Sequence, residues 1–389
     1  MISISRLLCD THSLGDSLRY GESLPGSIEV STPAPVVVWN CTSRCNLRCI
    51  HCYASANEKQ YQAEMDTASG KALIGDLAEF GVPVILFSGG EPVIRDDLLE
   101  LAQSAIQQGI RVALSSNGTL ITDDVALELS EVGFAEVGIS LDGMETINDC
   151  FRGKRGAYRE ALEGIRNCIK HELRVSLRFT ITRFNYQEIP AMFSLAEQEG
   201  IDRLCFYHLA YSGRGSKLIQ EDIDQTQTRQ VVDTICQLTE DLHNRGLPKE
   251  VLTVANHADG VYLYLKLKQR NPERAQLVYD LLQRNGGNNS GVKIGAVDPA
   301  GNVHPDQFWW HYSAGNVLER KFGDIWKDTS DSLMRGLKDR KNLLKGQCGS
   351  CHYLDICNGN LRERAEAVYG DVWAEDPACY LTDEEIGMK

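Results

Sequence analysis

Short apolar runs alternate with amphipathic segments over the first half of the chain, and this alternation restricts the fold more than any other feature. Apolar runs typical of buried strands cover 36–39, 82–87, 112–115, 136–141, 175–181 and 204–208. Helical patterns lie between them at 68–79, 96–108, 123–132, 157–171 and 189–199. Strands that alternate with helices of this length predict a parallel sheet. Right-handed crossovers would curl six such units into a barrel or partial barrel.

The pattern changes outside this region and predicts four parts. A polar segment, 1–34, is expected to pack along the outside of the main domain, the barrel, over 35–215. A helical linker over 216–290 follows, and a smaller α+β domain is expected over 291–389. A hairpin that pairs 292–297 with residues from 303 onward, around Pro299-Ala300-Gly301, would open this domain.

Composition excludes several classes of protein. The 389 residues are 42% hydrophobic and 24% charged, as in ordinary globular proteins. The formal net charge of −14 argues against nucleic acid as the main partner, because phosphate binding requires a basic surface. No apolar run reaches the roughly 20 residues of a membrane helix. The N-terminal residues lack the apolar core of a signal peptide, so we expect a cytoplasmic protein without a membrane partner.

Three cysteines follow the first predicted strand at spacings of four and three: Cys45, Cys49 and Cys52. Thiolates are soft ligands that select iron–sulfur clusters or zinc. Three sulfurs would leave one iron of a four-iron cube without a protein ligand. A structural zinc site would need a fourth close ligand, for which Cys41 and His51 are candidates.

A second group near the C-terminus supplies four thiolates, at Cys348, Cys351, Cys357 and Cys379. Four thiolates can close either an iron–sulfur cube or a zinc site, and their number alone does not separate the two. Since 13 cysteines occur in a chain with no export signal, metal ligation is favoured over disulfides.

Polar and glycine residues follow the later predicted strands, where a barrel places its ligand contacts. Ordinary turns are the alternative for the Gly-Gly, Asn-Gly and Asp-Gly steps, and a structural ion pair is the alternative for the arginine inside the fifth strand. The residues concerned are Gly89, Gly90, Glu91, Ser116, Asn117, Ser140, Asp142 and Arg178.

A segment dense in aromatic residues and histidine covers 301–311 and could form a flat apolar wall for a macrocycle. His304 or His311 could then act as an iron ligand or proton donor, and Tyr207 and His257 are further candidates. Buried structural aromatics and hydrogen-bonded histidines are the commoner explanation of such a segment.

The three clustered cysteines, followed about forty residues later by Gly89-Gly90-Glu91, resemble the radical S-adenosylmethionine (SAM) superfamily. This resemblance implies a radical SAM partial (β/α)6 TIM barrel and a 4Fe–4S cluster whose open iron binds SAM. It also implies that all eight strand-end residues named above contact SAM. An electron donor such as ferredoxin or flavodoxin would be needed.

The second cysteine group resembles the SPASM and twitch extensions of this superfamily, which hold auxiliary clusters. Leu361 and Asp306 stand where the full SPASM pattern has cysteines. The resemblance therefore implies one auxiliary 4Fe–4S cluster rather than two.

Five further stretches together resemble the tetrapyrrole-modifying radical SAM enzymes: 18–21, 256–262, 304–309, 346–360 and 376–381. One branch of this family removes two acetate side chains from 12,18-didecarboxysiroheme and gives Fe-coproporphyrin III. The other branch removes two propionate side chains during heme d1 synthesis. The segments 18–21 and 256–260 favour the first branch. An iron-bearing tetrapyrrole is then the expected substrate.

Two other functions remain possible at this point. SPASM enzymes often modify peptides, but they usually carry a small recognition domain for which 1–34 is too short. A non-catalytic protein that binds zinc or iron–sulfur clusters would explain the cysteines, but would leave Gly89-Gly90-Glu91 and the barrel pattern as coincidences.

Overall fold

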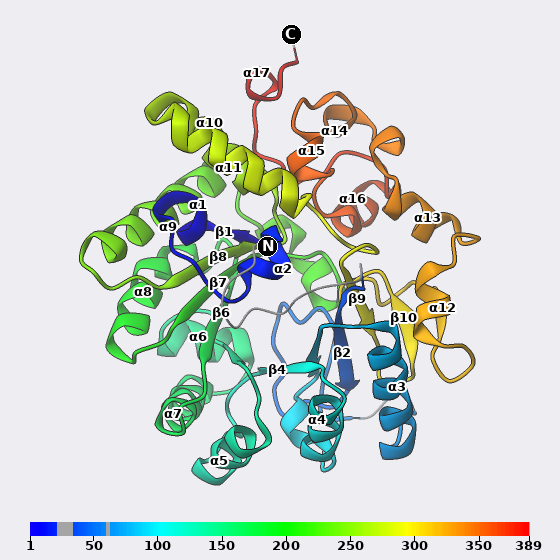
Figure 1. Cartoon of the computed structure of the whole chain (residues 1–389). Helices are drawn as coiled ribbons and strands as arrows, with labels where there is room; N and C mark the ends of the chain where they lie inside the picture. Colours follow the sequence, from blue (N-terminus) through cyan, green and yellow to red (C-terminus); the bar gives the residue numbers. More distant parts are fainter. Residues whose placement is uncertain (22–33, 60–62, 389) are drawn as a thin grey trace.

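The computed structural model describes residues 1–21, 34–59 and 63–388 (Figure 1). Within them, eleven strands form one sheet in the order β1-β8-β7-β6-β5-β4-β3-β2-β9-β10-β11. The strands are β1 (Ile2–Ser3), β2 (Val36–Thr42), β3 (Val84–Gly89), β4 (Arg111–Ser116), β5 (Val137–Ser140), β6 (Val175–Ile181), β7 (Arg203–His208), β8 (Glu250–Val254), β9 (Ile294–Val297), β10 (Asn302–His304) and β11 (Gly315–Asn316).

The helices lie mainly between the strands and in the last third of the chain. The α-helices are α1 (Ile4–Cys9), α2 (Asp16–Tyr20), α3 (Thr67–Phe80), α4 (Leu98–Gln107), α5 (Asp123–Val132), α6 (Glu145–Arg152), α7 (Ala157–Lys170), α8 (Ile189–Gln198), α9 (Gln225–Asn244), α10 (Ala258–Arg270), α11 (Pro272–Asn285), α12 (Phe322–Lys327), α13 (Ser332–Lys338), α14 (Gly346–Ser350), α15 (Leu354–Cys357), α16 (Arg362–Tyr369) and α17 (Asp383–Ile386). Short 3-10 helices cover Pro92–Ile94, Tyr186–Glu188, Gly213–Glu221 and Lys341–Leu343.

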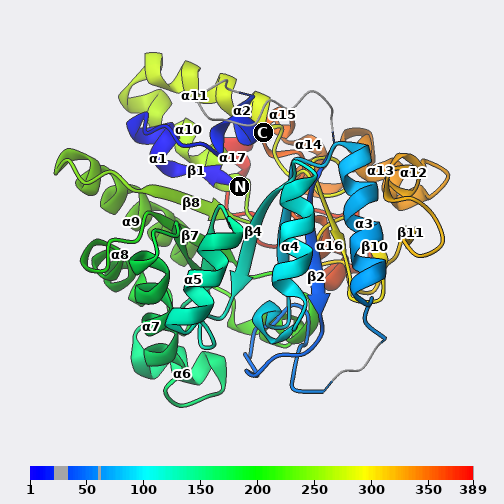
Figure 2. The same cartoon turned by 60° about the horizontal axis from the view of Figure 1, so that its bottom comes forward.

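The predicted α/β partial barrel is confirmed. Strands β2 to β7 pair in chain order, each parallel to the next, and helices α3 to α8 surround their outer face (Figures 1 and 2). Side chains alternate along each strand. In β2, the Trp39 ring lies against Gly70 of the outer helix α3, where an added Cβ would be 2.9 Å from it, whereas Val38 lines a pocket inside the barrel. Because strands β2 to β7 are parallel, their carboxyl ends all lie at the same end of the barrel.

Both edges of this sheet are extended by strands that lie outside the six predicted units. Strand β8 pairs parallel with β7, and β1 pairs antiparallel with β8. On the other edge, β9 pairs parallel with β2 and carries the predicted hairpin, β9–β10, to which β11 adds. Segments 1–34, 216–290 and 291–389 thus each contribute strands to the barrel sheet.

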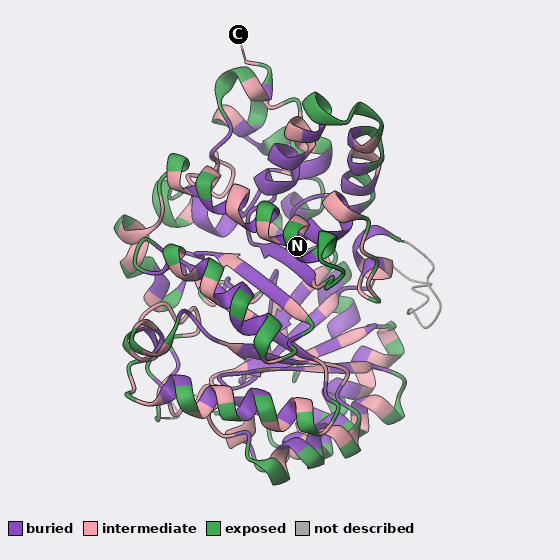
Figure 3. Ribbon diagram, turned by 90° about the vertical axis from the view of Figure 1, so that its left-hand side faces the viewer, coloured by how far each residue is buried: buried purple, intermediate pink, exposed green. Residues whose placement is uncertain are grey.

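The remaining helices pack beyond the sheet edges. Helix α1 packs against α9, α2 against α11, and α15 against both α10 and α11. Figure 3 shows buried residues along the sheet and exposed residues on the outward faces of the surrounding helices. Of the helices in the described residues, none is long and apolar enough to cross a membrane.

One close helix contact holds a loop of the barrel's carboxyl end. Gly164 of α7 lies against Gly118, in the loop after β4, and a Cβ atom on Gly164 would lie 2.3 Å from the Gly118 carbonyl oxygen. Because that oxygen belongs to the backbone, it cannot move away as a side chain could. The helix therefore requires glycine at this position.

We expect Gly164→Ala to lower the free energy of unfolding by about 1 kcal/mol. Overpacking costs ~1–3 kcal/mol, which outweighs the roughly 1 kcal/mol that alanine gains in a helix. Gly75→Ala in α3 is the matched control, because its Cβ would meet nothing nearer than 3.7 Å. The free energy of unfolding of this control variant should equal or exceed that of the unmodified protein. Chemical denaturation of both variants measures the difference, and equal stability would contradict the packing argument.

Candidate active site

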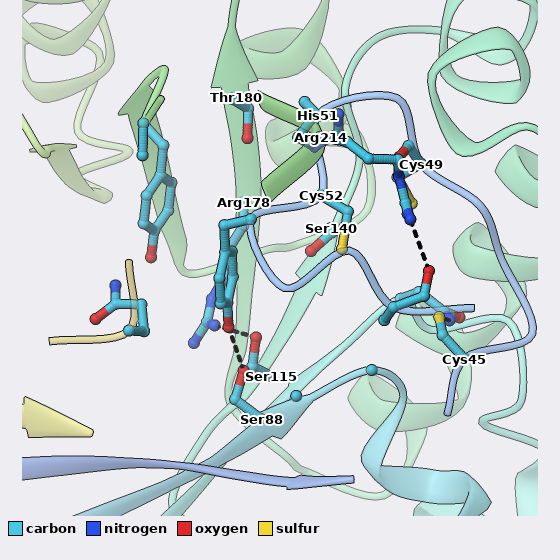
Figure 4. A pocket seen from close by; sticks show the side chains of 18 of the residues that line it. Cys45, Cys49, His51, Cys52, Ser88, Ser115, Ser140, Arg178, Thr180 and Arg214 are labelled. Atoms are coloured by element: carbon cyan, nitrogen blue, oxygen red, sulfur yellow. Dashed lines mark hydrogen bonds between the residues drawn. The ribbon is translucent and has the colours of Figure 1, made fainter. Parts of the chain in front are cut away.

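A pocket of about 180 Å³ lies at the carboxyl ends of the strands. Ser88, Ser115, Ser140 and Thr180 enter it from β3, β4, β5 and β6. Figure 4 shows these side chains together with Arg178 and the loop that carries the three clustered cysteines. The pocket is thus bounded by strand-end polar side chains and by the cysteine loop.

The cysteine loop is fixed to the turn after β3 by backbone hydrogen bonds. The Gly90 N–H donates to the Thr42 carbonyl at 2.7 Å, and the Glu91 N–H donates to the Arg44 carbonyl at 2.8 Å. A Cβ atom on Gly90 would lie 1.9 Å from the Arg44 carbonyl oxygen, and one on Gly89 would lie 2.3 Å from that of Thr42. Both glycines are therefore needed for the loop to pack this closely.

The three clustered cysteines all line the pocket, and donors surround their sulfurs. Burial raises the pKa of Cys45 to about 12, which favours the thiol in the absence of a metal. Asn117 Nδ2 lies 3.8 Å from Cys45 Sγ, and Arg152 Nη1 lies 3.6 Å from Cys49 Sγ. Donors and a positive charge at these distances stabilise thiolates, the form that ligates metals.

The cysteine geometry fits an iron–sulfur cube better than a single metal ion. No three His, Cys, Asp or Glu side chains in the described part of the chain are placed to hold one ion. A cube, by contrast, takes each thiolate on a different iron. Cys41 lies outside the pocket, with its Sγ 3.4 Å from the Ser88 carbonyl oxygen, and His51 Nε2 faces Asp142 at 3.3 Å. Cys41 is therefore turned away from the other three cysteines, whereas His51 lines the pocket with them and its buried Nδ1 has no hydrogen-bond partner among the described residues.

Glu91 lies behind the pocket wall rather than in it. Its carboxylate accepts hydrogen bonds from Ser116 Oγ at 2.8 Å and from the Asn117 N–H at 2.7 Å. Burial raises the pKa of Glu91 to about 7, although these hydrogen bonds oppose the shift. In this structure, Glu91 therefore orders the loop after β4, which carries two predicted SAM contacts.

Asp142 is also fully buried and does not line the pocket. Its Oδ2 forms an ion pair with Arg152 at 2.5 Å, and its Oδ1 accepts the Thr180 N–H at 2.8 Å. Burial lowers the pKa of the neighbouring His51 to about 4, despite the nearby carboxylate. Asp142 thus contacts His51 of the cysteine loop directly and positions Arg152 beside Cys49.

The other six predicted SAM contacts do line the pocket: Gly89, Gly90, Ser116, Asn117, Ser140 and Arg178. Arg178 Nη1 donates to Ser115 Oγ at 2.5 Å, and its buried Nε has no hydrogen-bond partner among the described residues. Gly138 makes room for this side chain, because a Cβ there would lie 2.2 Å from Arg178 Nε. Arg178 therefore has no carboxylate partner here and can offer donors to a ligand.

The four catalytic candidates are placed differently. Tyr207 lines the pocket, and His257 lines a second cavity deeper in the barrel. His304 lines neither, since its Nδ1 contacts the Tyr312 carbonyl oxygen. His311 is exposed and pairs with Glu366 at 2.7 Å. The structure thus brings Tyr207 and His257 to the barrel interior and leaves His304 and His311 outside it.

The second cysteine group converges around a small separate pocket, which Cys348, Cys351, Cys357 and Cys379 all line. Arg362 Nη2 lies 3.9 Å from Cys348 Sγ and supplies a positive charge. Asp306 lies elsewhere, in the deeper cavity of the barrel, where its carboxylate accepts the Phe308 N–H at 2.7 Å. The structure thus brings together the four thiols that the sequence predicts as ligands of a second metal site.

Two arginines of the site were not singled out from the sequence. Besides Arg152, Arg214 fastens the cysteine loop, since its Nε donates to the Cys49 carbonyl at 2.6 Å and its Nη1 donates to that of Ala56 at 2.9 Å. Both lie far from the cysteines in sequence, at the end of α6 and just after β7. No local motif marks such residues, because only the fold brings them to the loop.

Comparison with known proteins now identifies the family. Residues 39–196 match the model of the radical SAM superfamily. The chain is 56% identical over 395 aligned positions to Fe-coproporphyrin III synthase of Methanosarcina barkeri, covering 100% of this chain and 99% of that protein. It is 42% identical to pre-heme d1 synthase of Dinoroseobacter shibae, covering 93% of this chain and 90% of that protein.

A solved structure supports the same assignment at the level of fold. Streptococcus suis SuiB, bound to S-adenosylmethionine, matches with a TM-score of 0.70 at 18% identity, over 90% of this chain and 78% of SuiB. The chain therefore belongs to the radical SAM superfamily and, within it, to the family that contains the Fe-coproporphyrin III and pre-heme d1 synthases.

Proposed function

We propose that this chain is an Fe-coproporphyrin III synthase, which removes two acetate side chains from 12,18-didecarboxysiroheme. The observation that carries this proposal is 56% identity to such a synthase along the entire chain. The donor-rich pocket beside three cysteines supports it, because that arrangement suits the chemistry of the superfamily.

In this proposal, Cys45, Cys49 and Cys52 hold the catalytic 4Fe–4S cluster, and the strand ends hold SAM. When bound, this pair supplies a 5′-deoxyadenosyl radical by reductive cleavage of SAM. Arg178 receives the SAM carboxylate, for which its unpartnered Nε is suited. Ser140, Ser116 and Asn117 line the same pocket, and in this proposal they contact the nucleoside.

Tyr207 is our choice for the residue that supplies a proton near the reacting carbon. It lines both the SAM pocket and the deeper cavity, so it lies between the two proposed ligands. Burial raises the pKa of Tyr207 to about 12, and the phenol therefore stays protonated near neutral pH. His304 and His311 are less suitable, since they lie outside both cavities.

We assign the second cysteine group to one auxiliary 4Fe–4S cluster. All four thiols line one pocket, which leaves no iron free for substrate. Such a cluster would transfer electrons or stabilise the fold. Reduction of the catalytic cluster would come from a ferredoxin or flavodoxin.

Pre-heme d1 synthesis is the second candidate, because 42% identity extends over most of the chain. It requires removal of propionate rather than acetate side chains from the same macrocycle. Peptide modification is less supported, since SuiB, which has also been solved bound to the precursor peptide SuiA, is similar to this chain in fold alone, at 17% identity.

Anaerobic turnover with SAM, a reductant and 12,18-didecarboxysiroheme should give a product of the mass of Fe-coproporphyrin III. Mass spectrometry of the extracted macrocycle makes the measurement. Loss of propionate side chains would instead assign the chain to heme d1 synthesis. An unchanged macrocycle alongside 5′-deoxyadenosine would contradict both functions and leave the SAM chemistry intact.

Replacing Cys45, Cys49 and Cys52 together with alanine should lower the iron content from about eight to about four per chain. It should also abolish 5′-deoxyadenosine formation, because SAM loses its site at the catalytic cluster. Iron and sulfide assays on the reconstituted variant test the first effect, and chromatography of the reaction mixture tests the second.

The control is Cys150→Ala, since Cys150 is an exposed residue of α6. This variant should keep both clusters and full SAM cleavage. If the triple variant retained no iron, the assignment of an auxiliary cluster to the second group would be wrong.

A further inference from the structure

A second cavity of about 310 Å³ occupies the amino-terminal half of the barrel. It shares Leu86, Arg178, Tyr207, Gln307 and Phe308 with the SAM pocket, so the two cavities meet inside the barrel. A molecule bound in the deeper cavity would therefore reach the SAM site from inside the barrel, on the side opposite the cysteine loop.

The walls of this cavity combine apolar surface with positive charge. Val36, Val84, Leu252, Val254 and Phe308 are among the apolar residues that line it. Six arginine and lysine side chains line it as well, against two carboxylates. The cations are Arg19, Arg111, Arg174, Arg178, Arg203 and Lys293, and the carboxylates are Glu136 and Asp306. This excess is notable in a chain with a net charge of −14.

Half of these cations are already neutralised by ion pairs. Glu250 lies behind the cavity wall and pairs with Arg19 at 2.7 Å, with Arg174 at 2.6 Å and with Arg203 at 2.6 Å. Arg203 also pairs with Glu136. This ion-pair cluster links β8 to helix α2 and to neighbouring strands, and its role is structural.

The other three cations have no carboxylate partner among the described residues. Arg111, at the start of β4, makes no side-chain hydrogen bond there, and burial lowers its pKa. Lys293, just before β9, donates only to the backbone carbonyls of Arg284 and Asn285, at 3.1 and 3.2 Å. Arg178 donates only to Ser115.

The three unpaired cations surround an apolar floor. Between β4 and β9 in the sheet lie β3 and β2, whose first residues, Val84 and Val36, line the cavity. Arg111 and Lys293 therefore stand on opposite sides of a small apolar surface, while Arg178 lies nearer the SAM pocket. Partly buried charges left unpaired are costly, which is why such residues commonly mark a site for an anionic ligand.

We infer that this cavity binds a flat, apolar ligand that carries several carboxylates, with Arg111 and Lys293 as carboxylate-binding residues. Resting on the proposed function, this ligand is the iron macrocycle, whose peripheral carboxylates face the cations. Arg178 and Tyr207 then separate the macrocycle edge from SAM. The cavity, rather than the loop face of the barrel, selects the substrate.

The test is binding of 12,18-didecarboxysiroheme to the reconstituted enzyme under anaerobic conditions and without SAM, measured by the change in the absorption spectrum of the macrocycle. Arg111→Gln and Lys293→Gln should each weaken binding roughly tenfold or more, because each removes a charge-assisted hydrogen bond. Arg111→Lys, which keeps the charge, should recover part of the affinity. Arg159→Gln is the matched control, since Arg159 is 76% exposed on the outer surface.

SAM affinity of each variant, measured separately, should equal that of the unmodified enzyme, which shows that the barrel is intact. If the enzyme binds the macrocycle and the Arg111 and Lys293 variants bind it equally well, the inference is overturned and the proposed function stands. If the unmodified enzyme does not bind the macrocycle, the proposed function itself fails.

Discussion

The site depends on the backbone contact between the cysteine loop and the turn after β3. Two N–H groups of the turn, from Gly90 and Glu91, donate to carbonyls of the loop at Thr42 and Arg44. Since the turn is continuous with β3 and the loop with β2, paired parallel strands fix the position of the thiols. Arg152 and Arg214 then bind the far side of the loop. The three thiols proposed to hold the catalytic cluster are thereby positioned by the sheet itself.

The charged side chains inside the barrel differ in sign from the excess charge of the chain as a whole. The chain as a whole is acidic, yet the barrel interior carries arginine and lysine side chains that exceed the carboxylates around them. Glu250 neutralises the cations next to β8 and so stabilises that edge of the sheet. The cations toward β4 and β9 remain available. The paired cations beside β8 thus stabilise the sheet, whereas the unpaired cations toward β4 and β9 are the ones that we propose to bind the ligand.

Much of the fold could be predicted, because six strand–helix units leave a strong local pattern from Val36 to His208. Strand β8 was not predicted, since Glu250–Val254 is a short run inside a segment dominated by helices. The cysteines could be found from their spacing, but Arg152 and Arg214 could not, because tertiary contacts alone bring them to the loop. The roles expected for Glu91 and Asp142 also depended on side-chain direction, and the structure turns both carboxylates toward protein groups.

The central claim is that radical chemistry in this barrel acts on the acetate side chains of an iron macrocycle. Its most direct test is transfer of deuterium from substrate to 5′-deoxyadenosine, with 12,18-didecarboxysiroheme labelled in the acetate methylene groups. Mass spectrometry should find deuterium in the nucleoside, because we propose that the 5′-deoxyadenosyl radical takes its hydrogen atom from these groups. Deuterium transfer only from propionate-labelled substrate would contradict the claim.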